Sequence, residues 1–96
     1  RLQSRADSKA NRQALLAQRR PLIKEIEQLE KKIAKWTEEK AALDARFADP
    51  SYYVTVDRQK SEEMHRQAGL LGEQIDEAEL RWLEVHEALE ALPNPD

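Results

Sequence analysis

The sequence predicts an all-α protein, an antiparallel two-helix coiled-coil hairpin. Three observations predict it: two series of apolar residues with heptad spacing, a short turn-rich segment between them, and a composition with 36% charged residues, 5% aromatic residues and two glycines. Such a composition is typical of long, solvent-exposed helices rather than of a compact globule. Ninety-six residues form at most one small domain, with little room for an enclosed active site.

The first helix is expected over residues 9–47, after a flexible linker at residues 1–8. Its apolar residues recur at alternating intervals of four and three, the spacing of a coiled-coil seam. Pro21 either opens this helix in its first turn or kinks a helix that begins earlier. The predicted seam positions are Leu22, Ile26, Leu29, Ile33, Trp36, Lys40, Leu43 and Phe47, of which Lys40 alone is polar.

The second helix is expected over residues 56–92, with a tail at residues 93–96. Thr55 is a plausible N-cap, and Pro93 ends the helix. Its seam has the same alternating spacing as that of the first helix. The predicted positions are Met64, Ala68, Leu71, Ile75, Ala78, Trp82, Val85, Leu89 and Leu92.

The loop at residues 48–55 is too short to run back along a long helix, so the two helices must be antiparallel. In the predicted alignment, two residues that face each other across the seam have numbers that add up to about 104. This alignment places Glu25 near Arg81. A shift by half a heptad is compatible with the same pattern.

The stretch "FADPSYYVTV" at residues 47–56 forms the tip of the predicted hairpin. Asp49-Pro50 ends the first helix, and Phe47 closes the end of the core. One ring of Tyr52 and Tyr53 is expected to cap the hairpin, while the other is a candidate contact with a partner.

Charge is distributed unevenly along the chain, although its net value is only −3. Residues 1–20 carry six basic side chains and one acid, whereas residues 73–90 carry seven acids and one arginine. This asymmetry has two compatible interpretations: the two ends of the chain neutralise each other, and the basic end is an arm for an acidic partner.

A basic strip on the first helix is a candidate nucleic-acid-binding surface, because lysine and arginine neutralise phosphates without reading bases. The alternative is that these charges only keep a coiled coil soluble. The candidate residues are Arg12, Arg19, Arg20, Lys24, Lys31 and Lys35.

No catalytic, metal-binding or cofactor-binding pattern is present in the sequence. There is no cysteine, and the two glycines cannot form a phosphate-binding loop. His65 and His86 are about 30 Å apart on one helix, too far to share a metal ion. No apolar run is long enough for a signal peptide or a bilayer span, so we expect a soluble, cytoplasmic chain. We also expect it to be monomeric, and the alternative is a dimer that forms a four-helix bundle.

Three segments of the chain resemble the C-terminal coiled-coil domain of bacterial ABC-F ATPases of the Uup and YheS type. They are "RRPLIKEIEQLEKKIAKW", "FADPSYY" and "ELRWLEVHEALEAL", in this order along the chain. One departure is Thr55-Val56, where the family often has Asp-Pro to start the second helix.

The resemblance implies a parent protein with two ATP-binding cassettes that binds ATP and Mg²⁺ there and acts on the ribosome in translation. It also implies a C-terminal domain that binds nucleic acid, either DNA or ribosomal RNA. We therefore expect a non-catalytic nucleic-acid-binding domain. The alternative is a structural spacer or a protein-docking module that uses the tip.

Overall fold

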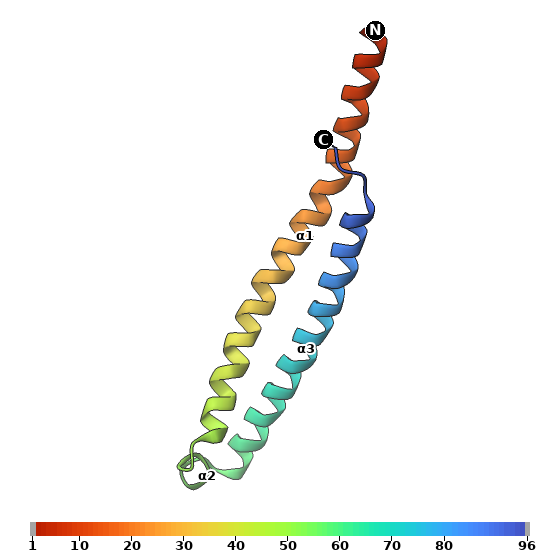
Figure 1. Ribbon diagram of the computed structural model, residues 1–96. Coiled ribbons are helices and arrows are strands. Elements are labelled where there is room, and N and C mark those ends of the chain that lie inside the picture. Colours follow the sequence, from red (N-terminus) through yellow and green to blue (C-terminus); the bar gives the residue numbers. More distant parts are fainter. Residues whose placement is uncertain (1, 96) are drawn as a thin grey trace.

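The computed structural model describes residues 2–95 and contains three helices in that range: α1 (Leu2–Ala48), α2 (Tyr52–Thr55) and α3 (Arg58–Ala91). Helices α1 and α3 lie side by side and antiparallel, and the short α2 closes one end (Figure 1). No strand occurs among the described residues. The molecule is a rod of 79 × 15 × 14 Å. The predicted all-α hairpin is confirmed.

Helix α1 is longer at its N-terminal end than predicted. Residues 2–8, which were expected to be a flexible linker, belong to it, and the helix runs through Pro21 without a break. Residues 4–20 include no glycine or proline and are rich in alanine, arginine and glutamine, which favour helix. Pro21 and Ala17 are both exposed, so water can reach the Ala17 carbonyl that loses its helical hydrogen bond. The alternative in which a helix opens at Pro21 is therefore wrong.

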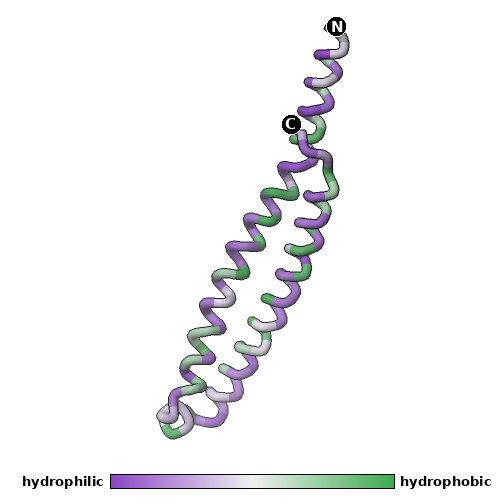
Figure 2. Tube along the Cα trace, viewed as in Figure 1, coloured by the Kyte–Doolittle hydropathy of each residue, from purple (hydrophilic) through white to green (hydrophobic). Residues whose placement is uncertain are grey.

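The predicted seam forms the core of the hairpin. Every predicted seam position of both long helices is buried or half-buried, including Lys40. Figure 2 shows hydrophobic residues recurring at intervals along both helices. Val85 is the most deeply buried side chain, at 2% exposure. The heptad spacing alone therefore located the residues that pack between the helices.

More residues are buried on α3 than on α1, because α3 contributes the small residues of the seam. Ala68 and Ala78 of α3 are buried, whereas Ile26 is the one α1 residue in the described core. Over Gly72, a Cβ atom would lie 3.5 Å from Cε of Lys40, so the lysine stem covers the glycine. Nζ of Lys40 reaches solvent and pairs with Asp44 Oδ2 at 2.8 Å. Lys40 thus has the structural role expected of a polar seam residue.

Helix α3 begins at Arg58, later than predicted, and its N-cap is Asp57 rather than Thr55. The Asp57 carboxylate accepts a hydrogen bond from the Lys60 amide at 2.8 Å. Thr55 instead belongs to α2, where its hydroxyl donates to the Ser51 carbonyl at 2.9 Å. Both residue types cap helices, but the α2 turn occupies the threonine hydroxyl and leaves the aspartate for α3.

The late start of α3 changes the register between the helices. Glu25 faces Arg81, as predicted, and these positions sum to 106. Phe47 stacks on His65 near the tip, and these positions sum to 112. Residues of α1 therefore meet partners up to about two helical turns further along α3 than the predicted alignment. The cause is the connection between α1 and α3 at the tip. It is longer than predicted, so the chain reverses direction at a later residue.

Arg81 and Glu25 form a bidentate ion pair across the two helices. Nε and Nη2 of Arg81 donate to the two carboxylate oxygens at 2.6 and 3.0 Å. The hydrogen bonds and charge of Arg81 hold the pKa of the Glu25 carboxyl below its usual value. In turn, Glu25 raises the pKa of Arg81. This pair adds charge complementarity to an interface that is otherwise apolar.

We expect Glu25→Gln to lower the melting temperature at pH 7 and to matter less in acid. Because the folded-state pKa of Glu25 is depressed, its stabilisation is present above the ordinary glutamate pKa of about 4.3 and disappears as pH falls through the folded value. Circular-dichroism melts at pH 7, 4.5 and 3 measure this. Glu27→Gln, an exposed neighbour, is the matched control. A difference from the wild type that stays constant down to pH 3 would contradict the expectation.

We expect Gly69→Ala to raise the free energy of unfolding by about 0.5–1 kcal/mol, because glycine in a helix interior has a high conformational entropy in the unfolded chain. A Cβ atom at Gly69 meets nothing within 4 Å. Gly72→Ala should gain a similar amount, because its nearest neighbour is the flexible end of Lys40. Urea denaturation followed by circular dichroism measures both. A loss of stability in Gly69→Ala would show that the α3 backbone is not helical there.

Candidate nucleic-acid interface

The side of α1 away from α3 carries most of the predicted basic strip. Arg20, Lys24, Lys31 and Lys35 are exposed. Successive lysines are separated along the helix axis by about 10 and 6 Å. Within the described part of the chain, no hydrogen bond or ion pair engages any of these four side chains. Their charges are thus available to an anionic partner.

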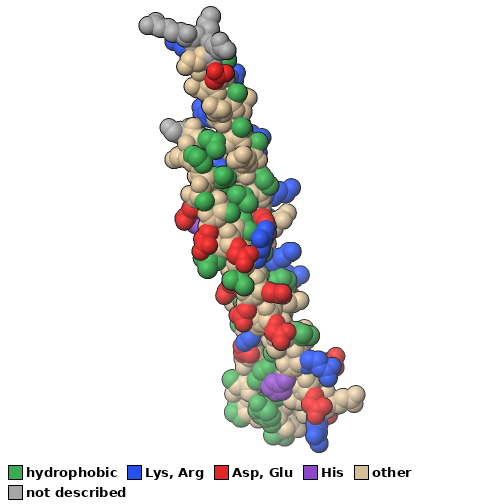
Figure 3. Space-filling view, turned by 90° about the vertical axis from the view of Figure 1, so that its right-hand side faces the viewer, with side chains coloured by type: hydrophobic (Ala, Val, Ile, Leu, Met, Phe, Trp, Pro, Cys, Tyr) green, Lys and Arg blue, Asp and Glu red, His purple; other side chains and the backbone are tan. Residues whose placement is uncertain are grey.

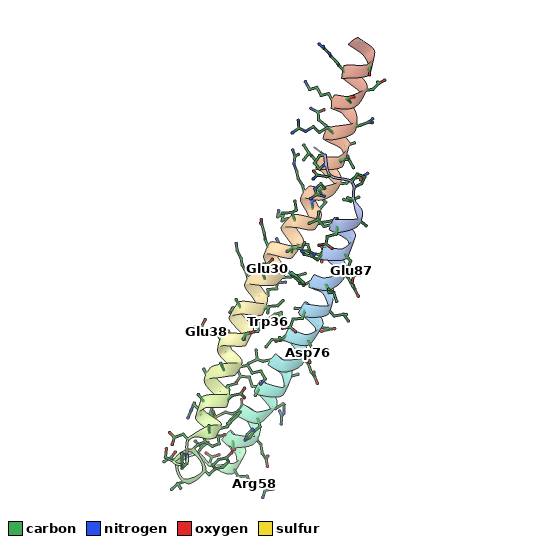
Figure 4. All side chains as sticks on the ribbon, in the orientation of Figure 1. Glu30, Trp36, Glu38, Arg58, Asp76 and Glu87 are labelled. Atoms are coloured by element: carbon green, nitrogen blue, oxygen red, sulfur yellow. The ribbon has the colours of Figure 1, made fainter. Side chains whose placement is uncertain are left out.

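The strip has a defined end toward the tip and one additional member. Glu38 projects from α1 on the side away from α3 (Figure 4), three residues after Lys35. Lys32, which was not among the predicted residues, is exposed and lines a shallow groove with Lys24 and Gln28. In the sequence, the only sign of this additional residue is that Lys32 directly follows Lys31. The basic strip therefore ends at Lys35 and is wider than predicted, although the exposed Glu27 lies between Lys24 and Lys31 on the same face.

Arg19 and Arg12 lie differently from the rest of the predicted strip. Arg19 is half-buried, and its Nη1 donates to the Leu89 carbonyl at 3.5 Å. The Leu89 carbonyl also accepts from the Leu92 amide at 3.2 Å, and a cation is favourable at the C-terminal end of a helix. Arg19 therefore caps the end of α3 and is less available to a partner. Arg12 is exposed on the part of α1 that extends beyond α3.

The alignment of the two helices determines which charged segments of the chain lie side by side. Acidic residues 73–90 of α3 lie beside the paired part of α1, whereas residues 4–14 extend past the end of α3 (Figure 1). Figure 3 shows acidic side chains gathered over the middle of the face that it presents. The acidic stretch therefore does not cover the N-terminal basic residues. Arg19 contacts the end of α3, and residues 4–14 project beyond it, so the two interpretations remain compatible.

The two adjacent tyrosines of the tip have different environments. Tyr52 is 3% exposed, and its hydroxyl donates to Ser61 Oγ at 2.9 Å. Its ring meets the edge of Phe47 at a centroid distance of 5.3 Å. Tyr53 is 65% exposed, and the next residue, Val54, is 86% exposed. Tyr52 is therefore the ring that caps the hairpin, and Tyr53 is the one that a partner can reach.

The two histidines pack on aromatic rings of the seam. His65 stacks on Phe47 at 3.9 Å between ring centroids, and His86 stacks on Trp82 at 4.8 Å. Nδ1 of His86 also lies 3.3 Å from a carboxylate oxygen of Glu90. Among residues 2–95, no group of three His, Asp or Glu side chains is placed to hold a metal ion. Nor does any helix in that range have an apolar stretch that could cross a membrane.

A helical hairpin with a single seam, a closed tip and oppositely charged outer sides defines a coiled-coil hairpin domain. A scan against protein-family models matches residues 20–87 to the family described as the ABC transporter C-terminal domain. This match covers more than two thirds of the chain, so the chain belongs to that family. It is a C-terminal domain of an ABC-family protein. No curated protein and no solved structure gives a significant match.

We expect Tyr52→Phe to lower the free energy of unfolding by about 0.5–1.5 kcal/mol, because it removes the hydrogen bond to Ser61 and leaves the packing in place. Tyr53→Phe is the matched control and should change stability by less than about 0.5 kcal/mol, because its side chain is exposed. Urea denaturation of the three proteins measures the difference. Equal effects of the two substitutions would contradict the assignment of Tyr52 as the cap.

Proposed function

We propose that this domain binds nucleic acid through the basic side of α1. The observation that carries the proposal is the exposure of Arg20, Lys24, Lys31 and Lys35 on one helix, without an internal partner among the described residues. Such a surface neutralises phosphates by charge and contributes affinity without base specificity. The acidic outer side of α3 would repel nucleic acid, so a bound strand is oriented toward α1.

The resemblance to ABC-F ATPases suggests the setting of this activity. In this proposal the parent protein hydrolyses ATP with Mg²⁺ in two cassettes, acts on the ribosome in the cytoplasm, and uses this domain as a monomeric contact with ribosomal RNA or DNA. Family membership supports a parent of the ABC class. The chain itself requires no cofactor for a contact of this kind, because charge neutralisation needs none.

A second candidate function is a spacer or protein-docking module that contacts its partner at the tip. Exposed Tyr53 and Val54 favour it, because an exposed aromatic ring beside an aliphatic side chain is typical of a protein contact. In this alternative, nucleic-acid affinity is absent and the function depends on Tyr53. The two candidates use different residues, on the side of α1 and at the tip, and can be separated by mutation.

We expect Lys24→Glu/Lys31→Glu/Lys35→Glu to weaken binding to short DNA and RNA duplexes by at least about tenfold at 50 mM salt, because three phosphate contacts are replaced by repulsion. Fluorescence anisotropy between 50 and 200 mM salt measures both affinity and its salt dependence. The slope of log affinity against log salt should fall in magnitude by about 3.

The matched control is Arg46→Glu/Lys60→Glu/Arg66→Glu, which changes the net charge equally but at exposed positions near the tip and on α3. It should weaken binding far less. Equal losses in the two triple variants would mean that only net charge matters and that the α1 face is not the site. Absence of binding by the wild type at low salt would reject the proposed function.

A further inference from the structure

A shallow apolar groove lies on one side of the hairpin, between α1 and α3. Ile33 and Ala34 of α1 and Trp82 of α3 form its apolar lining, and its volume is 380 Å³. Glu30 and Glu79 line it from the two helices. Ile33 and Trp82 are half-buried, so the part of each ring or chain that the partner helix does not cover faces the groove. Two helices alone therefore leave this side of the seam open.

Two exposed aliphatic side chains extend this groove away from the tip. Ile23 precedes Ala34 by three helical turns, and both lie on the same side of α1. Leu83 follows Glu79 by one turn and lies on the groove side of α3. The numbers of Ile23 and Leu83 add up to 106, as do those of the interhelical ion pair, so the two residues are level along the rod. The extended surface is about 16 Å long. We call the surface formed by Ile23, Ile33, Ala34, Trp82 and Leu83 the side groove.

The opposite side of the seam has a different character. There Arg81 pairs with Glu25 across the helices, and Lys32 lies in the same shallow depression as Arg81. Along the side groove, Nε1 of Trp82 donates to Oε1 of Glu30 at 3.3 Å, and no ion pair joins the two helices there among the described residues. A third helix can therefore pack on the side groove without displacing an interhelical ion pair.

The rim of the side groove is acidic on both helices. Glu30 of α1 and Glu79 of α3 line the groove. Asp76 precedes Glu79 by one turn, and Glu87 follows Leu83 by one turn, so they extend the acidic rim along α3. All four carboxylates are on exposed residues. On the α3 side of the rod, acidic and hydrophobic side chains lie next to each other (Figure 3). The groove thus has an apolar floor and a negatively charged rim.

The acidic rim determines what kind of partner fits the side groove. In a two-fold dimer through this groove, a second copy would place the same carboxylates against it, and like charges across an interface are unfavourable. The basic strip of a second copy has the right charge but no apolar stripe, because residues 24, 28, 31 and 35 are lysine or glutamine. An amphipathic helix with lysine or arginine beside an apolar face meets both requirements.

We propose that the side groove binds a basic amphipathic helix of another protein. Its apolar side chains pack on Trp82 and Leu83, and its cations pair with the rim carboxylates. The contact is short, which corresponds to weak, reversible binding. It uses neither the basic strip of α1 nor the tip, so this inference is independent of the proposed nucleic-acid binding.

The test uses a fluorescein-labelled helical peptide of about 18 residues, with leucine at heptad positions a and d and lysine at e and g. One control peptide has glutamate in place of lysine, and another has serine in place of leucine. Fluorescence anisotropy measures the affinity of the wild-type protein for each peptide. The basic amphipathic peptide should bind at least about tenfold more tightly than either control.

Two matched pairs of variants locate the contact. Leu83→Gln should weaken binding of the basic amphipathic peptide by about fivefold or more, whereas Leu70→Gln should change it by less than about twofold. Leu83 and Leu70 are 49% and 54% exposed, but they lie about 140° apart around α3. The second pair is described in the next paragraph, and circular dichroism checks that each variant stays helical.

Glu30→Gln/Glu79→Gln removes two rim charges, and its control Glu39→Gln/Glu73→Gln removes two exposed charges elsewhere, again one from each helix. The first variant should weaken binding more and reduce its salt dependence. Glutamine at position 30 keeps an acceptor for the Trp82 indole.

Three results would overturn the inference. The first is binding of the basic amphipathic peptide no tighter than that of a control peptide, and the second is an equal effect of the two variants in either pair. The third comes from sedimentation equilibrium of the protein alone, which should give a monomer. A dimer that Leu83→Gln dissociates would mean that a second copy covers the side groove. None of these results bears on whether the basic side of α1 binds nucleic acid.

Discussion

The packing of Tyr52 under the tip fixes the alignment of α1 and α3 along the whole rod. A heptad pattern alone permits several alignments, because a shift of half a heptad places apolar residues opposite apolar residues again. Tyr52 removes this freedom by contacting Phe47 of α1 and Ser61 of α3 at once. Because both helices are stiff, the alignment set at the tip determines that Arg81 meets Glu25 and that Arg19 reaches the end of α3.

A hairpin of two helices buries one stripe on each, and this limit shapes the remaining surface. The large seam residues of α1, such as Trp36, stay half-exposed because only α3 covers them. All other positions face water and are free to carry charge. The outer side of α1 is basic, whereas the acidic residues collect on α3 between positions 73 and 90. The molecule is therefore electrostatically two-sided, which orients a charged ligand even though the net charge is small.

The sequence pattern predicts the core and, to within one residue, the C-terminal ends of α1 and α3, but not the residues at which these helices begin. Spacing predicted the seam, because burial of a helix face depends on period alone. The sequence predicts Thr55 as the cap of α3, but Asp57 is an equally suitable residue type, and only the α2 turn decides between them. The helical state of residues 2–8 was missed because no apolar stripe marks it. Within the candidate site, the exposed lysines were predictable from spacing, whereas the capping role of Arg19 depends on where α3 ends.

Pro21 lies within the paired part of α1, because Arg19, which precedes it, contacts the Leu89 carbonyl of α3. A proline removes one backbone hydrogen bond, so the helix is most easily bent near it. The paired part is held by the seam, by the Arg81–Glu25 ion pair and by the tip, whereas residues 4–14 have no neighbouring helix. Contacts with α3 on both sides of Pro21 therefore oppose bending of α1 at this point. The rod combines a stiff hairpin, which preserves the alignment, with a helical segment at residues 4–14 that projects beyond α3.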